Sequence, residues 1–223
     1  MGRLFNLDSP AMVFLSRLAD LMILNIIIMI VCIPIITIGP ALTAMHYVIL
    51  KMVRKEEGYL VRPFFTSFKN NFKQATLSWL IVLVFIIIFV IDLNIINNSG
   101  LEFASWLRII LIAVGVIAAM TAIYVFPLIA RFENSIRGTF KNALFMSILS
   151  LPKTATMIVI YILPIALVLL NPQVLPIIFL LGITGPGYLC AMLYSKTFKR
   201  FEPEEEVLKD ADDWTVNMDE EVK

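Results

Sequence analysis

Two long stretches of this sequence contain no lysine or arginine, and the hydrophobic segments lie inside or beside them. The first stretch runs from Ala75 to Leu107 and the second from Thr154 to Ser195. In membrane proteins, lysine and arginine collect in cytoplasmic loops, so this alternation indicates membrane spans and the side on which their connections lie. The pattern predicts an integral membrane protein, and it carries no information about a reaction or a transported solute.

The composition excludes an ordinary soluble domain. Hydrophobic residues make up 60% of the 223 residues and charged residues 16%, whereas globular proteins average about 45–50% and about 25%. A soluble chain of this length cannot bury so much apolar surface, so we expect the lipid bilayer to be its main partner. The net charge of +1 gives no reason to expect a nucleic-acid partner. Cys32 and Cys190 both lie in apolar segments and predict no disulfide framework.

The hydrophobic runs predict the fold class, an all-α integral membrane helix bundle with one transmembrane domain over residues 1–201. About five transmembrane helices are predicted, at residues 21–38, 77–93, 107–130, 155–170 and 177–194. Pro34 and the Gly39-Pro40 pair are expected to bend or break the first of them, and Gly185-Pro186 interrupts the fifth. Such breaks free backbone carbonyls and amides, which in transporters often line a binding site.

The basic residues predict an orientation. Those between spans one and two, between spans three and four, and after span five are Lys51, Arg54, Lys55, Arg62, Lys69, Lys73, Arg131, Arg137, Lys141, Lys153, Lys196, Lys199 and Arg200. The other side holds only Arg108, with Arg3 and Arg17 near the start. The positive-inside rule then predicts an N-terminus outside and a C-terminus in the cytoplasm. One alternative stays open, because the segment before Leu21 fits an amphipathic helix that lies along the interface.

Two cytoplasmic segments have the spacing of amphipathic helices. Phe64, Phe68 and Phe72 recur every four residues in one of them, and Phe140, Leu144 and Ile148 repeat that spacing in the other. Such helices suit the headgroup level of the membrane or a position under the bundle, and these six residues are candidate contacts with a partner. Residues 202–223 form an acidic cytoplasmic tail that is predicted to be disordered, with docking through Trp214 as the alternative.

The residues needed for catalysis or metal binding are not grouped in this sequence. Its single histidine, His46, stands beside Tyr47 without a neighbouring carboxylate or cysteine, which favours a histidine on the helix surface or one bonded to a backbone carbonyl. No catalytic or nucleotide-binding motif is present, so we expect no enzyme and no cofactor. The polar residues deep in the spans suit interhelical hydrogen bonds of about 0.6 kcal/mol each; they are Asn25, Thr37, Thr43, Thr121 and Thr184.

Three segments carry a family resemblance: "NIIIMIVCIPIITIGPALTAMHYVILKMVRKEEGY", "FFTSFKNNFKQAT" and "YVFPLIARFENSIRGTFKNAL". Through them, the chain up to about Phe201 resembles the YesL-like family, small bacterial multipass membrane proteins of unknown function. The resemblance implies a plasma-membrane protein encoded near carbohydrate ABC importers and glycan-degrading enzymes. It implies no catalytic or binding residues.

Two functions are therefore expected as alternatives. The first is an accessory or regulatory membrane protein of a carbohydrate ABC uptake system, in contact with permease subunits or with copies of itself. The second is a small carrier or channel for a sugar or another small solute, with its site at the Gly-Pro helix breaks.

Overall fold

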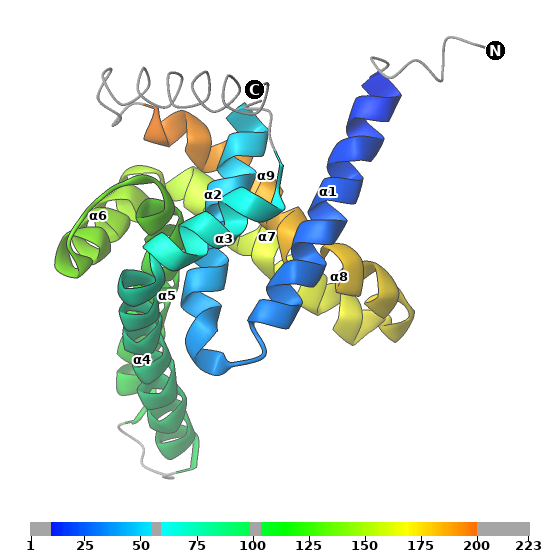
Figure 1. Cartoon of the computed structure of the whole chain (residues 1–223). Coiled ribbons are helices and arrows are strands. Elements are labelled where there is room, and N and C mark those ends of the chain that lie inside the picture. Colours follow the sequence, from blue (N-terminus) through cyan, green and yellow to red (C-terminus); the bar gives the residue numbers. More distant parts are fainter. Residues whose placement is uncertain (1–9, 55–58, 99–103, 200–223) are drawn as a thin grey trace.

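The computed structural model describes residues 10–54, 59–98 and 104–199, and every element in these ranges is a helix (Figure 1). The elements are α1 (Pro10–Val31), η1 (Ile35–Thr37), α2 (Ile38–Arg54), α3 (Val61–Asn70), α4 (Phe72–Asn98), α5 (Ala104–Arg131), α6 (Ile136–Leu149), α7 (Leu151–Leu170), η2 (Pro172–Val174), α8 (Leu175–Leu181) and α9 (Thr184–Phe198). The predicted all-α class is confirmed.

The length and apolar composition of the helices identify a membrane-spanning bundle. Five helices are long and apolar enough to cross a bilayer, and a bent pair, Pro172–Leu181 with Thr184–Phe198, passes the same test as a sixth. The longest are α4 and α5, with 27 and 28 residues, or about 40 Å of helix at 1.5 Å per residue. Most of their apolar side chains point away from the protein. Because hydrocarbon is the environment that suits such a surface, these helices contact the lipid bilayer.

The structure differs from the prediction of one bent span at residues 21–38. The first helix, α1, ends at Val31, a short turn follows, and α2 starts a second, separate span. The segment before residue 21 continues α1 from Pro10 and is not a separate interfacial helix. Thr37 stabilises the turn, because its hydroxyl donates to the carbonyl oxygens of Val31 and Pro34. The Val31 carbonyl lies at the end of α1, where it has no amide partner within the helix, whereas the Pro34 carbonyl also accepts from the Thr37 amide at 3.1 Å.

The last predicted span also differs in detail. It is divided into α8 and α9, which meet at 58°. The break falls at Gly182 and Ile183, whereas Gly185 and Pro186 lie in the first turn of α9. Proline is tolerated there because the first amides of a helix have no partner within it. The other predicted spans, 77–93, 107–130 and 155–170, lie within α4, α5 and α7.

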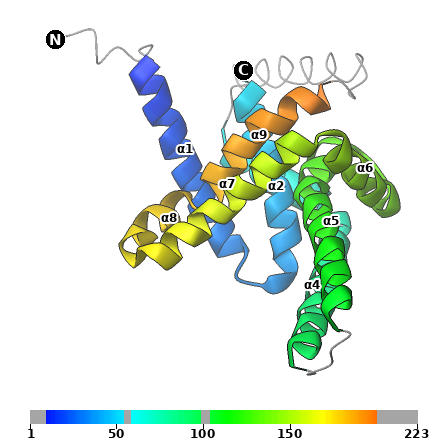
Figure 2. The same cartoon turned by 180° about the vertical axis from the view of Figure 1, so that it is seen from behind.

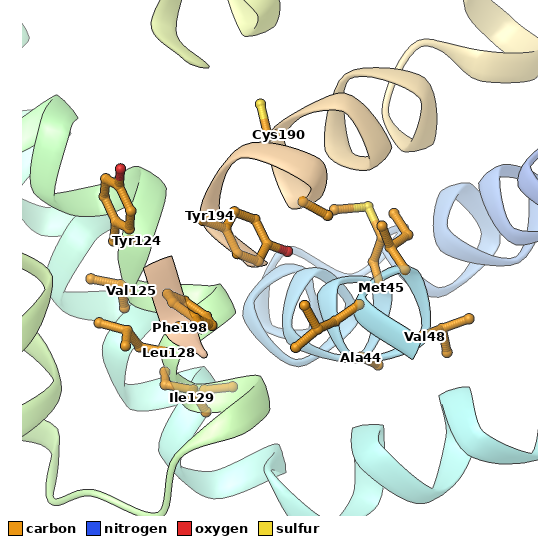
Figure 3. Close-up of a cluster of buried hydrophobic side chains, with 14 of the residues drawn as sticks. Ala44, Met45, Val48, Tyr124, Val125, Leu128, Ile129, Cys190, Tyr194 and Phe198 are labelled. Atoms are coloured by element: carbon orange, nitrogen blue, oxygen red, sulfur yellow. The ribbon is translucent and has the colours of Figure 1, made fainter. Parts of the chain in front are cut away.

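The second helix, α2, is the centre of the molecule and contacts α1, α3, α4, α5 and α9. A Cβ atom on Gly39 would lie 2.4 Å from the carbonyl oxygen of Ala75, so this glycine is what allows α2 and α4 to approach closely. Figure 3 shows α9 between α2 and α5, where Phe198 faces Val125 and Leu128. All three of these side chains are buried, and they belong to one continuous core.

One end of the bundle carries nearly all of the positive charge. The start of α1 and the end of α9 lie at the same end, the upper one in Figures 1 and 2. Apart from Arg108, the basic residues of the described chain belong to this side of the molecule: Arg17, Lys51, Arg54, Arg62, Lys69, Lys73, Arg131, Arg137, Lys141, Lys153, Lys196 and Lys199. They stand in α1, at the end of α2, in α3, at the start of α4, at the end of α5, in α6, at the start of α7 and at the end of α9. The opposite end, where α5 begins, has Arg108. We call the first of these the basic end.

Candidate functional site

A group of buried hydrogen bonds joins α1 to the break between α8 and α9. Asn25 is fully buried, and its Nδ2 donates to the carbonyl oxygen of Phe179 at 2.8 Å. Its Oδ1 accepts from the backbone amides of Ile183 and Thr184, both at 3.1 Å. The Thr184 hydroxyl in turn donates to the carbonyl oxygen of Leu21 at 2.9 Å. We call this group the Asn25 junction.

The Asn25 junction replaces the hydrogen bonds that the helix break removes. In a continuous helix the amide of Ile183 would bond to the carbonyl of Phe179, four residues earlier. The break separates these two groups, and the Asn25 side chain binds both. Because these amides and this carbonyl already have a partner, they are not free to coordinate an ion or a solute. This arrangement weakens the prediction of a binding site at Gly185 and Pro186.

The Gly39-Pro40 pair has a different role from the predicted helix break. Both residues lie in the first turn of α2 and are buried. The chain reverses before them, in the turn that contains Pro34, which precedes the short helix η1. Pro40 removes no helical hydrogen bond in this first turn, and Gly39 provides the close contact with α4. Of the predicted break residues, Pro34 is therefore the one within the chain reversal.

His46 forms a second buried polar contact, which the sequence did not predict. Its Nδ1 lies 3.0 Å from the Tyr194 hydroxyl, and both side chains are buried. The rings meet edge to face, with centroids 5.9 Å apart. Figure 3 shows the Tyr194 hydroxyl pointing from α9 toward α2. The expected partner, a backbone carbonyl, is thus replaced by a phenol that lies 148 residues away in the chain.

Further hydroxyl contacts tie α5, α6 and α7 together near the basic end. The Tyr124 and Thr154 hydroxyls lie 3.1 Å apart, and Thr154 Oγ1 donates to the carbonyl oxygen of Ser147 at 3.0 Å. Lys153 Nζ donates to Thr197 Oγ1 at 2.8 Å, which connects α7 to α9. These bonds hold helices together, and no group of three or more His, Cys, Asp or Glu residues suited to a metal occurs among the described residues.

A third group of polar side chains lies on α2 and α4 without partners. The side-chain atoms are Thr43 Oγ1, Thr76 Oγ1, Ser78 Oγ and Trp79 Nε1, all buried and without a hydrogen bond in the described part of the chain. A Cβ on Gly39 would lie 2.6 Å from Trp79 Cβ, and Thr43 follows Gly39 by one helical turn. Buried polar groups without partners are costly, and we call these four atoms the α2–α4 seam.

The six candidate contact residues divide between the core and the surface. Phe64 is fully buried, Phe68 packs against the core and Phe72 is 38% exposed, with successive ring centroids 6.3 and 5.5 Å apart. The stripe therefore extends from α3, which holds Phe64 and Phe68, to the first residue of α4, Phe72, and becomes more exposed along its length. In α6, Phe140 also packs against the core and Leu144 is partly buried, whereas Ile148 is exposed. Their role in binding a partner stays a prediction.

An exposed apolar face on α6 contains Ile148, which was predicted from the sequence, and two residues that were not predicted. Phe145, Ile148 and Leu149 are 54, 52 and 72% exposed. The same helix carries Arg137 and Lys141, both exposed and one turn apart. Helical spacing places Phe145 one turn after Lys141, so basic and apolar side chains adjoin on the surface. The four-residue spacing of Lys141, Phe145 and Leu149 was visible in the sequence. The predicted stripe, Phe140, Leu144 and Ile148, stands one residue earlier in the helix.

The fold and these contacts define the class of the protein: an all-helical integral membrane bundle whose buried polar side chains join its helices. Residues 21–93 match the model of a family described as "Protein of unknown function, DUF624". This match confirms the resemblance to a family of unknown function over a segment that holds half of α1, all of α2 and α3, and most of α4. No curated protein matches the chain. No solved structure matches it either.

Proposed function

We propose that this protein is an accessory membrane subunit that assists or regulates a carbohydrate ABC uptake system. The observation that carries the proposal is the exposed apolar face of α6, made by Phe145, Ile148 and Leu149 beside two basic residues. This face lies at the basic end and is not used by the bundle's own core. The carbohydrate system comes from the resemblance to the YesL-like family, which implies such a gene neighbourhood. Self-association stays a prediction.

The proposal includes a revised orientation in a bacterial plasma membrane. The external N-terminus predicted from the sequence depended on an odd number of crossings. With α1 and α2 as two spans and the bent α8–α9 pair as one, the count of candidate spans is six. Because the start of α1 and the end of α9 share the basic end, the positive-inside rule places both in the cytoplasm.

Affinity purification from native membranes in a mild detergent tests the partner. The wild-type protein should recover permease or solute-binding components of an importer. An Ile148→Asp/Leu149→Asp variant should lose them, because charges on this face oppose an apolar contact. Leu170→Asp is the matched control, since Leu170 is 84% exposed at the end of α7. Repeated recovery of the wild-type protein alone would refute the proposal, and so would an unchanged yield with the α6 variant.

A small carrier is the second candidate, favoured by the partnerless groups of the α2–α4 seam. For a carrier, vesicles that contain the protein should take up a solute from a panel of sugars faster than empty vesicles. Thr43→Val and Trp79→Phe, which remove a hydroxyl and an indole N–H, should reduce that uptake. Uptake equal to that of empty vesicles across the panel would eliminate this candidate.

A further inference from the structure

A shallow groove of about 540 Å³ lies between α5 and α6, which pack side by side. It is lined by Val114, Ile117, Ala118, Thr121, Phe140, Lys141 and Leu144. Lys141 is the charged member of this set. The hydroxyl of Thr121 is turned to its own helix, where it donates to the carbonyl oxygen of Ile117 at 2.8 Å. The groove therefore offers apolar walls and one cation.

The α5 wall of the groove is a single straight stripe. Its four residues stand at positions i, i+3, i+4 and i+7, on one face of the helix. At 1.5 Å per residue the stripe is about 10 Å long from Thr121 to Val114. It leads away from Arg131, the last residue of α5, which lies at the basic end. Thr121 lies about 15 Å and Val114 about 26 Å along the helix from Arg131, so the stripe occupies the middle of the α5 span.

The α6 wall supplies the charge of the groove. Lys141 and Arg137 are both exposed and lie one turn apart on this helix. The Lys141 ammonium lies 6.0 Å from the centre of the Phe145 ring, on the next turn. An amphipathic molecule with an anionic head and a hydrocarbon chain matches this order of charge and apolar surface.

We propose that the α5–α6 groove is a binding site for an anionic phospholipid of the cytoplasmic leaflet. The far part of an acyl chain lies along the stripe from Thr121 to Val114, and the ammonium group of Lys141 reaches toward the headgroup phosphate. A sugar would leave the apolar walls unused, and a zwitterionic lipid has no net charge to offer the ammonium group. The site requires the basic end to be cytoplasmic, and it does not depend on the proposed importer partner.

Native mass spectrometry of the full chain in mild detergent tests the site. The probes are phosphatidylglycerol and phosphatidylcholine with identical acyl chains, added at equal low excess. Wild-type protein should retain phosphatidylglycerol over phosphatidylcholine, and Lys141→Gln should lower that retention about fivefold, the effect of one basic residue at an anionic surface. Lys196→Gln is the matched control, because Lys196 is also an exposed lysine at the basic end and lies on α9, outside the groove. Equal retention of the two lipids, or an equal effect of the two substitutions, would overturn the proposal.

Two further measurements separate a lipid from a free phosphate compound. Glycerol 3-phosphate carries the anionic group without an acyl chain, so it should not displace the lipid at millimolar concentration. Ala118→Leu fills the apolar wall and should lower phosphatidylglycerol retention while Lys141 is unchanged. Displacement by glycerol 3-phosphate, or full retention by Ala118→Leu in a protein with unchanged thermal stability, would show that the acyl chain does not lie in the groove.

Discussion

Replacement of Asn25 by leucine tests whether one side chain holds the break between α8 and α9. Leucine has a similar size but forms no hydrogen bond, so three backbone groups lose their partner: the Phe179 carbonyl and the amides of Ile183 and Thr184. Hydrogen bonds between membrane helices average about 0.6 kcal/mol, which gives about 2 kcal/mol for three. Buried groups without a partner cost about 1–3 kcal/mol each. We expect Asn25→Leu to lower the free energy of unfolding by about 2–5 kcal/mol. The loss stays below the sum of three full penalties, because the Ile183 amide and the Phe179 carbonyl can bond to each other if the break straightens.

The assay is reversible unfolding in mixed micelles of dodecyl maltoside and SDS, followed by circular dichroism. Asn94→Leu is the control, because Asn94 also donates a hydrogen bond, to the carbonyl oxygen of Val90 at 2.9 Å, but is exposed on α4. That variant should change the free energy of unfolding by less than about 0.5 kcal/mol. If Asn25→Leu is as stable as Asn94→Leu, the Asn25 junction does not hold the break, and the argument against a solute site there fails.

Three other predictions concern the packing and the topology. Gly39→Ala should destabilise the bundle by about 1–3 kcal/mol or more in the same unfolding assay, because the new Cβ would meet the backbone of Ala75. Gly185→Ala is the control and should be close to neutral, because its Cβ would lie 3.7 Å from the nearest side chain. A double-mutant cycle with His46→Phe and Tyr194→Phe should give a coupling energy of about 0.6–1.7 kcal/mol, and a coupling of zero would show that the 3.0 Å contact stabilises nothing. Protease tags at the two termini should both be protected in intact spheroplasts and both be cut after lysis, and a single exposed terminus would refute the six-span arrangement.

The long apolar helices were predictable from the sequence because membrane insertion depends on local composition. The helices α4, α5 and α7 are almost purely apolar over about 20 residues or more, and the predicted spans lie within them. The second helix was not recognised as a span, because Thr43, His46 and Lys51 lower its mean hydropathy. Those residues are tolerated because α2 is surrounded by other helices, and this burial by neighbours is not visible in a hydropathy pattern.

The polar contacts were predictable in kind but not in place. Interhelical hydrogen bonds were expected for five residues, and they are confirmed for Asn25 and Thr184. The expectation is wrong for Thr121, which bonds within its own helix, and for Thr37, which stabilises a turn. It is also wrong for Thr43, whose hydroxyl has no hydrogen bond within the described part of the chain. The partners of Asn25 lie 154 to 159 residues away, a separation over which a single sequence gives no pairing information.

The Asn25 junction has a consequence for how the chain tolerates substitution. All three of its strong bonds are made to main-chain atoms, which every residue except proline supplies in full. The side chains of Phe179 and Ile183 therefore take no part in these bonds, and substitution of either by another non-proline residue keeps the hydrogen bonds to Asn25. Asn25 cannot be replaced in the same way, because its side-chain amide both donates and accepts hydrogen bonds, and no shorter or non-amide side chain does both at the same distance from the backbone.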